Sequence, residues 1–377
     1  MSNLVLKLVK DLINCPSITP DDHNCQKIIV DKLSSIGFKI EFFNKNGVTN
    51  LWAVYGNNSP LLVFAGHTDV VPPGPLNCWN SDPFHATERN GFLYGRGAAD
   101  MKSSIAAFII AIEELIRDNG NNFFGSIGIL LTSDEEGPAK DGTLHVCQQL
   151  KQRNLNIDYC IVGEPTSEFI LGDTCKKGRR GSLSAHLSVK GIEGHIAYPK
   201  IIDNPIHKIS IIISDLVNTK WDNGNEYFEP TSFQISNIHA GNGATNVVPG
   251  TVELDFNLRF SSEIDDIKIK NIVNNILKKY NTIYDINWNL NAKPFITKSG
   301  LLTKSIIQAI KSETGIETKL STSGGTSDGR FLIDIADEVI EFGPCNNTIH
   351  KYNECIKISD LEKMKNIYKH TLELLLI

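Results

Sequence analysis

The sequence predicts an α/β catalytic domain, built on a mixed sheet with helices on both faces, that is interrupted by an inserted α+β domain. With 377 residues, the chain is too long for one ordinary hydrophobic core. Short apolar runs alternate with amphipathic helical patterns in its first half and again near its end. Between these parts the pattern changes to period-two alternation. We therefore expect a discontinuous catalytic domain, 1–180 with 292–377, and an inserted domain, 181–291.

The expected elements of the catalytic domain follow from the period of the apolar residues. Short apolar runs bounded by turn residues are typical of buried strands, and amphipathic runs are typical of helices. Because helices separate the strands, we expect them to cover both faces of the sheet. The strands are expected over 39–43, 51–55, 61–65, 127–131, 159–162 and 339–342, and the helices over 4–13, 24–36, 103–117, 143–152, 301–314 and from Leu361 onward.

The inserted domain shows the alternation of a sheet with one wet face. Leu183, Ala185, Leu187 and Val189 alternate with polar residues, and the same pattern returns over 252–260. Helical patterns occupy 204–217 and 267–280. These features predict an antiparallel sheet with helices on one side.

Composition excludes several classes of partner. The net charge is −6 and no long basic block is present, which argues against nucleic-acid binding. The eight cysteines occur singly, without a C-x-x-C pair, as expected for reduced thiols. Charged residues interrupt the apolar pattern over 4–13, unlike a signal peptide, and no run approaches membrane-spanning length. We expect a cytoplasmic protein with no membrane partner.

The segment 62–69 carries the first chemical signal. An apolar run of strand length ends at Gly66, and His67 and Asp69 follow. Residues two apart on an extended backbone share a face. Histidine is the commonest metal-ligating side chain, and a carboxylate behind its other ring nitrogen is its usual partner. Taken alone, the segment is equally typical of a polar strand end followed by a turn.

Four later segments place acidic or histidine residues at similar positions. In open α/β sheets, functional groups gather beyond the carboxyl ends of the strands. Nitrogen and oxygen donors together suit a divalent cation such as zinc, with manganese or cobalt as substitutes. The residues concerned are Asp100, which precedes a helix, Asp134, Glu135 and Glu136, which end a strand, Glu164, which ends another strand, and His350.

Charge balance favours two cations over one. Three carboxylates around one divalent ion leave excess negative charge. With two divalent ions and a bridging hydroxide, the positive and negative charges balance. Two ions about 3.5–4 Å apart are a recurrent hydrolytic arrangement. We assign His67, Asp100 and Glu164 to one Zn²⁺, and Asp100, Glu136 and His350 to the other, so that Asp100 bridges them.

Glu135 is the candidate general base. Adjacent side chains diverge, so Glu135 does not easily ligate beside Glu136. Near the bridging water it would accept a proton and return it to the leaving amine. Without a metal site, Glu135 and Asp134 would be solvated acids at a strand end.

The same segments resemble a known family. Residues 65–69, 95–104, 132–137, 162–166 and 343–350 resemble the dinuclear zinc hydrolases of the M20 peptidase group. Within the group, the resemblance is to members that hydrolyse N-succinyl-LL-2,6-diaminopimelate in lysine and diaminopimelate biosynthesis. It covers the whole chain in order, and its longer motifs are 95–104, 173–184, 194–199, 323–330 and 348–350.

The resemblance implies further roles. The metal roles match those assigned above, with Asp69 and Glu135 as catalytic residues. The peptide bond between Asp100 and Met101 is expected to be cis. The inserted domain is expected to act as a lid and to form a homodimer, in which His195 reaches the partner subunit's site and polarises the scissile carbonyl.

The resemblance also implies contacts with an anionic substrate. The expected substrate carries several carboxylates, which arginine side chains bind well. Without the resemblance, the basic run 176–180 would be interpreted as a solvated face, and the segment 324–327 as a flexible loop. Thr245 departs from the asparagine common in this branch, so of that loop only Asn246 is carried over. The implied contacts are Lys176, Arg179, Tyr198, Asn246, Arg259, Gly325, Thr326 and Asn346.

Two alternatives stay open at this point. One is a related deacylase that acts on N-acetylornithine or another N-acyl amino acid. The other is a member that binds metal but is inactive. The presence of all five metal ligands and of Glu135 argues against the second.

Overall fold

The computed structural model describes residues 4–120, 122 and 124–377, which form two compact units. Unit 1 comprises the described residues up to Gly178, together with Thr297–Ser321 and Ser327–Ile377. Unit 2 comprises Arg179–Ile296 and Thr322–Thr326. The second unit therefore interrupts the first along the chain, and each is described by itself.

Unit 1 is built on an eight-stranded mixed sheet with the strand order β1-β2-β6-β3-β7-β18-β8-β17. The central strands β6, β3, β7 and β18 run parallel, whereas β1, β2 and the β18–β8 pair are antiparallel. The predicted mixed α/β sheet is confirmed. The strands are β1 Lys39–Phe42, β2 Asn50–Tyr55, β3 Leu61–His67, β6 Ser126–Thr132, β7 Ile157–Val162, β8 Thr174–Lys176, β17 Lys319–Ser321 and β18 Ala336–Glu341.

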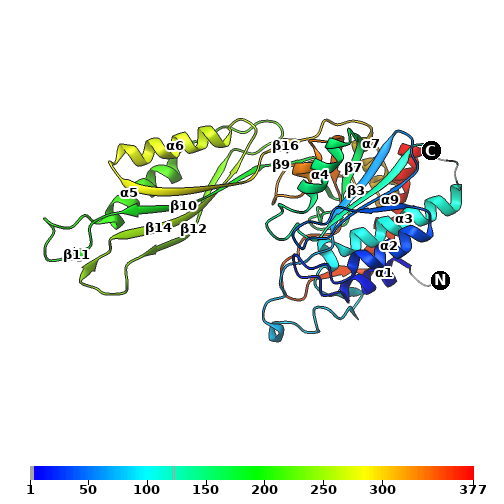
Figure 1. Ribbon diagram of the computed structural model, residues 1–377, viewed down its shortest axis with the longest axis horizontal. Coiled ribbons are helices and arrows are strands. Elements are labelled where there is room, and N and C mark those ends of the chain that lie inside the picture. Colours follow the sequence, from blue (N-terminus) through cyan, green and yellow to red (C-terminus); the bar gives the residue numbers. More distant parts are fainter. Residues whose placement is uncertain (1–3, 121, 123) are drawn as a thin grey trace. The chain divides into compact units, whose positions relative to one another are not determined.

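Helices cover both faces of this sheet (Figure 1). One face packs against α1 Leu4–Ile13, α2 Cys25–Ser35, α3 Ser103–Asn119, α7 Leu301–Thr314 and α9 Ile358–Leu376, and the other against α4 Thr143–Gln152 and α8 Gly329–Leu332. No helix within the described residues is both long and apolar enough to cross a membrane.

Alternation along β3 explains the two-sided core. Leu62 and Phe64 belong to the first core, whereas Val63 and Ala65 belong to the second. Phe64 stacks on Phe108 with ring centroids 4.3 Å apart. A strand that is buried on both faces in this way holds its carboxyl end at a fixed place in the sheet.

Short elements complete unit 1. A three-stranded sheet contains β4 Thr87–Arg89, β5 Phe92–Tyr94 and β19 Cys355–Lys357. Two short helical turns are η1 Leu76–Cys78 and η2 Ala98–Lys102. The strands β9 Gly178–Arg179 and β16 Phe295–Ile296 lie where the chain enters and leaves unit 2 along the sequence.

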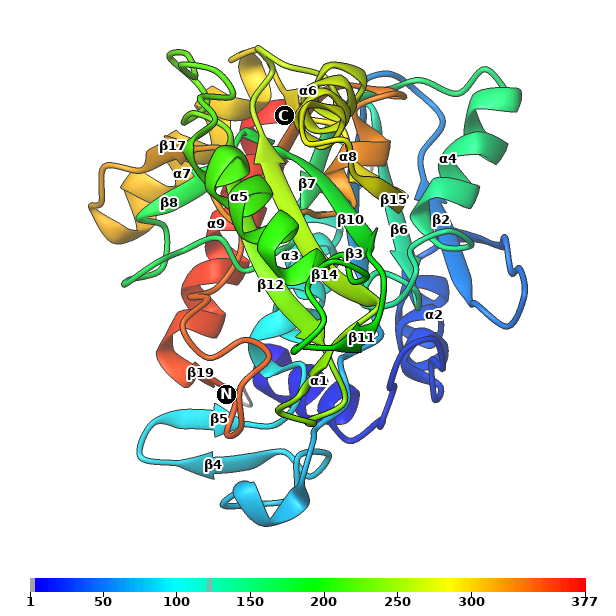
Figure 2. The same cartoon turned by 90° about the vertical axis from the view of Figure 1, so that its left-hand side faces the viewer.

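Unit 2 is an antiparallel sheet with two helices on one face (Figure 2). The strand order is β12-β14-β10-β15, as expected for α+β architecture. Strands β12 and β15 were not identified from the sequence, because most of their residues are exposed or only partly buried. The elements are β10 Gly181–Lys190, β11 Gly194–His195, α5 Pro205–Asn218, β12 Ser232–Ala240, β13 Val247–Val248, β14 Thr251–Phe260, α6 Asp266–Lys279 and β15 Ile283–Ala292.

Side-chain caps begin both helices of unit 2. Asn204 accepts a hydrogen bond from the Ile206 backbone N–H at 2.9 Å, and Asp265 accepts one from Lys268 at 2.7 Å. These carboxamide and carboxylate oxygens satisfy N–H groups that have no partner inside the helix.

Candidate active site

The carboxyl ends of three parallel strands of unit 1 meet at one edge of the sheet. Strand β3 ends at His67, β6 at Thr132 and β7 at Val162. The Thr68 N–H donates to the Thr132 carbonyl at 2.8 Å, and the Gly163 N–H donates to Ala65 at 3.0 Å. The polar segments that follow these strands are therefore held side by side.

Asp100 lies between the two histidines predicted as ligands. His67 Nε2 is 3.1 Å from Asp100 Oδ1 and 3.8 Å from Glu164 Oε1. His350 Nε2 is 3.4 Å from Asp100 Oδ2 and 3.0 Å from Glu136 Oε1. Each carboxylate oxygen of Asp100 thus faces a different imidazole, and the structure brings together all five residues of the predicted metal set.

Glu135, which directly precedes Glu136 in the chain, belongs to the same cluster. Potential ligand atoms of His67, Glu135 and Glu164 lie within 4.8 Å of one another, as do those of His67, Asp100 and Glu136. His67, Asp100 and Glu164 are buried, whereas His350 is exposed. The cluster is therefore enclosed on the His67 side and accessible to solvent at His350.

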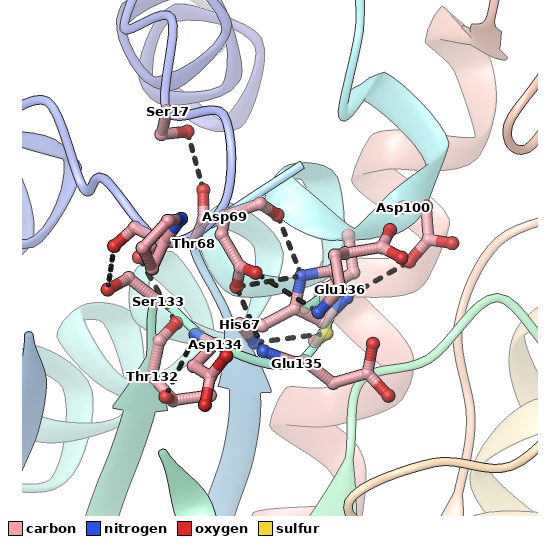
Figure 3. Close-up of polar contacts among 12 residues, drawn as sticks. Ser17, His67, Thr68, Asp69, Asp100, Thr132, Ser133, Asp134, Glu135 and Glu136 are labelled. Carbon is pink, nitrogen blue, oxygen red and sulfur yellow. Dashed lines mark hydrogen bonds and ion pairs between the residues drawn. The ribbon is translucent and has the colours of Figure 1, made fainter. Parts of the chain in front are cut away.

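Asp69 orients both His67 and the acidic turn after β6 (Figure 3). His67 Nδ1 donates to the Asp69 backbone carbonyl at 2.8 Å, while the Asp69 carboxylate is farther away at 3.7 Å. That carboxylate instead accepts the backbone N–H groups of Glu135 at 3.3 Å and Glu136 at 3.1 Å. Because a carbonyl only accepts, Nδ1 carries a proton, and Nε2 is the ring nitrogen that faces the acids.

The acids of the cluster outnumber its two histidines, and burial and mutual charge shift the pKa values of the group. Burial alone would lower the pKa of His67, but its hydrogen bond to Asp100 and the charge of Glu164 raise the pKa well above the ordinary value. Burial, reinforced by the charge of Glu164, raises the pKa of Glu135 well above its usual range. Burial also raises the pKa of Asp69, to about 6. Acids gathered in this way around two imidazole rings form a donor set that fits divalent cations.

Two glycines allow the side chain of Met101 to pack between the strand ends. A Cβ atom on Gly66 would lie 2.3 Å from Met101 Cε, and one on Gly163 would lie 2.5 Å from the same atom. Met101 is fully buried. The Asp100–Met101 peptide bond is cis, which confirms what the resemblance implied. With Met101 buried on one side, Asp100 faces the histidines.

A loop that the sequence analysis did not assign to the site supports the residue after His67. Ser17 Oγ donates to the Thr68 carbonyl at 2.6 Å, and Thr68 Oγ1 donates to Asp22 Oδ1 at 2.6 Å (Figure 3 shows the former). Ser133 Oγ donates to the Pro20 carbonyl at 2.7 Å. The only sequence signal was a pair of prolines, Pro16 and Pro20, around a three-residue segment, which is typical of many loops.

Two of the predicted substrate contacts belong to unit 1. Lys176 is almost fully buried, and its Nζ lies 3.4 Å from Ser321 Oγ. Asn346 is half-buried, and its backbone N–H donates to the Ser167 carbonyl at 2.9 Å. Burial of Lys176 removes the alternative that this position is simply part of a solvated charged face.

The remaining predicted contacts belong to unit 2, where they form two separate groups. Arg259 pairs in register with Ser182 near the start of β10, and Arg179 Nη1 donates to the Ser323 carbonyl at 3.3 Å, in the segment that also contains Gly325 and Thr326. The other group lies beyond the far end of β10, and its members are His195, Tyr198 and Asn246.

The length of β10 separates these two groups. The strand has ten residues, from Gly181 to Lys190. At about 3.3 Å per residue, it spans roughly 30 Å. The Ile196 N–H donates to the Asn246 carbonyl at 3.1 Å, so the far group is held together. One small molecule therefore cannot contact both groups of a single unit 2.

At this edge of the sheet, one aspartate lies between two histidines, and a further buried glutamate lies beside them. This arrangement is typical of the class of dinuclear metal hydrolases. Residues 63–374 match the family model described as Peptidase family M20/M25/M40. The chain belongs to this family.

Curated relatives match the chain over its full length. A succinyl-diaminopimelate desuccinylase from Bordetella parapertussis is 57% identical over 376 residues, covering 100% of this chain and 99% of the relative. A protein of the same name from Herminiimonas arsenicoxydans is 54% identical over 372 residues, covering 99% of each.

Solved structures share the fold at much lower identity. An M20 family metallo-carboxypeptidase from Sulfolobus solfataricus aligns with a TM-score of 0.82 at 19% identity, covering 99% of each chain. Human carnosine dipeptidase 1 aligns with a TM-score of 0.75 at 18% identity, covering 98% of this chain and 95% of that one. These two structures support the fold alone.

Replacing Gly163 by alanine should disturb the site through packing. The new Cβ would lie 2.4 Å from Phe64 Cζ and 2.5 Å from Met101 Cε, so the side chains of Phe64 and Met101 must shift, and we expect the shift of Met101 to disturb the adjoining Asp100. We expect Gly163→Ala to lower the free energy of unfolding by about 1–3 kcal/mol, and to weaken Zn²⁺ binding. Denaturant unfolding and Zn²⁺ titration measure the two effects. Gly250→Ala, whose Cβ would meet no atom closer than 3.6 Å, is the control. Equal behaviour of the two variants would contradict this packing role.

Proposed function

We propose that the protein hydrolyses N-succinyl-LL-2,6-diaminopimelate to succinate and LL-2,6-diaminopimelate. The reaction would serve lysine and peptidoglycan-precursor biosynthesis in the cytoplasm. The observation that carries the proposal is the 57% identity, over the full chain, to a relative named succinyl-diaminopimelate desuccinylase. The convergence of Asp100, His67 and His350 supports the chemistry, because it supplies the donor set of a dinuclear centre.

The centre would hold two Zn²⁺ ions per chain, with Co²⁺ or Mn²⁺ as possible substitutes. His67, Asp100 and Glu164 would hold one ion, and Asp100, Glu136 and His350 the other. When bound, such ions polarise an amide carbonyl and lower the pKa of water. Asp69 keeps the His67 ring in the orientation that leaves Nε2 free to bind.

Glu135 would move the proton. Its backbone N–H is held by Asp69, and its carboxylate lies beside His67 and Glu164. The carboxylate takes a proton from the attacking water and returns it to the leaving nitrogen, so that one water is consumed and one amide bond is cleaved. Burial raises the pKa of Glu135, which brings a carboxylate closer to the range useful for such transfers.

Cationic and polar side chains would bind the substrate carboxylates. Lys176, Arg179 and Arg259 supply positive charge, and guanidinium groups bind carboxylates with two parallel hydrogen bonds. Burial lowers the pKa of Arg259, as does the neighbouring charge of Arg180; a substrate carboxylate would offset both effects. The further contacts would be Tyr198, Asn246, Gly325, Thr326 and Asn346.

The two groups in unit 2 support a homodimer formed through this inserted unit, which would also act as a lid. The roughly 30 Å length of β10 separates His195 from Arg259 within one chain. A substrate that needs both must take one of them from a second copy. His195 of the partner would then donate a hydrogen bond to the developing negative charge on the carbonyl oxygen.

A two-substrate assay tests the proposed function directly. Zinc-loaded protein should release succinate from N-succinyl-LL-2,6-diaminopimelate much faster than it releases acetate from N-acetylornithine. The variant Glu135→Gln, with its metal content unchanged, should lose about 10²–10⁴-fold of the succinate rate, because it lacks the base. A faster reaction with N-acetylornithine would show that the protein is a deacetylase instead. No release from either substrate would favour an inactive metal-binding protein.

Mixed dimers test the contribution of His195. His195→Ala and Glu135→Gln should each be nearly inactive alone. If His195 acts across the dimer, each mixed dimer contains one site with both residues intact. Half of the dimers are mixed in an equimolar mixture after full exchange, so about a quarter of the unmodified rate is expected. Mass spectrometry of differently labelled subunits establishes the exchange. No recovery after complete exchange would show that His195 does not act in the partner's site.

A further inference from the structure

Glu354 is a buried carboxylate that has no role in the proposed ligand set or in substrate binding. It lies four residues after His350 and directly before β19, and its exposed fraction is 0%. A carboxylate is rarely buried so completely unless every oxygen has a partner. The partners of Glu354 therefore indicate what it does.

Among the described residues, the four hydrogen bonds to this carboxylate come from the segment that leads to Asp100. Oε1 accepts the backbone N–H groups of Ala99 at 2.9 Å and Asp100 at 3.0 Å. Oε2 accepts the Gly97 N–H at 3.1 Å and Arg96 Nη1 at 2.9 Å. The carboxylate thus contacts the backbone of the aspartate whose side chain lies between the two histidines.

The local backbone needs such an acceptor. Asp100 has φ −121° and ψ 94°, which are not helical values, so the turn η2 does not supply its own regular hydrogen bonds. Ala99 and Asp100 are buried. A buried N–H without a partner destabilises the folded state, and Glu354 satisfies three of them at once.

Arg96 extends the same network to the other side of the cluster. Its side chain is 3% exposed, and Nη1 also donates to the Lys351 carbonyl at 3.1 Å. Lys351 directly follows His350. The ion pair between Arg96 and Glu354 therefore connects the backbone before Asp100 with the backbone after His350, and the paired charges allow both groups to be buried.

We propose that Glu354 is a positioning residue for the cation pair: its carboxylate fixes the backbone at Asp100 and, through Arg96, the segment after His350, so that both side chains face one point. The inference rests on the proposed dinuclear centre. In Glu354→Gln the shape is nearly kept, but the amide NH₂ group would face N–H donors in place of an acceptor. The turn would lose part of its support, and Asp100 would no longer be held in the bridging position.

Zinc affinity, measured apart from activity, tests this role. Metal-free Glu354→Gln would be titrated with Zn²⁺ against a chromophoric chelator, and with Co²⁺ to record its visible absorption spectrum. We expect about 10–100-fold weaker Zn²⁺ binding and an altered Co²⁺ spectrum, as for other residues that orient metal ligands.

Glu338→Gln is the matched control. Glu338 also accepts backbone N–H groups in unit 1, from Leu301 at 2.8 Å and Thr303 at 3.4 Å, but at the start of α7. Unfolding of the metal-free proteins measures the stability that each substitution costs. Glu338→Gln should lose stability and keep the Zn²⁺ affinity and Co²⁺ spectrum of the unmodified protein.

The outcomes separate this role from the proposed function. Unchanged Zn²⁺ affinity in Glu354→Gln, or an equal loss in Glu338→Gln, would overturn the positioning role while leaving the dinuclear centre intact. If Glu354→Gln does not fold, Glu354→Asp is measured, and a smaller but clear loss of affinity is expected. Failure of both variants to fold would make Glu354 a folding residue and overturn the role. An unmodified protein that binds no pair of cations would remove the proposed centre itself.

Discussion

The carboxylate of Asp100 faces two imidazoles, with Oδ1 3.1 Å from His67 Nε2 and Oδ2 3.4 Å from His350 Nε2. These two histidines are 283 positions apart in the chain (350 − 67). A protein gains nothing in stability from crowding glutamates around this point, because each buried acid raises the cost of ionising the next. The cluster is therefore suited to receive positive charge, and elements of unit 1 hold its residues in place.

Several independent constraints act on this one carboxylate. The side chains of β3 alternate between two buried cores, which fixes the strand that ends at His67. Strand β7 pairs in parallel with β3, which places Glu164 at the same edge of the sheet. Gly66 and Gly163 leave room for the side chain of Met101, which anchors the turn η2 from one side. The Asp69 carboxylate accepts the backbone N–H groups of the acidic turn after β6, and the Glu354 carboxylate accepts those of the segment that leads to Asp100. The geometry therefore depends on packing and hydrogen bonds within the protein itself, as preorganised sites require.

Strand ends were predictable because their signal is local. The apolar runs before His67 and Glu164 have strand length and end at glycine, so the sequence placed both residues at the correct edge of the sheet. The identity of the oxygen that holds the His67 ring was not predictable. A carboxylate was expected, but the backbone carbonyl of Asp69 takes that position and the carboxylate binds two backbone N–H groups. Glu354 was also missed, because its role depends on the direction of N–H groups in an irregular turn, which no periodicity records.

Metal stoichiometry and position, determined by anomalous diffraction from crystals of the zinc-loaded protein, test the central claim most directly. We expect two peaks per chain about 3.5–4 Å apart, with Asp100 in contact with both ions. A single ion, or two ions that do not share Asp100, would contradict it.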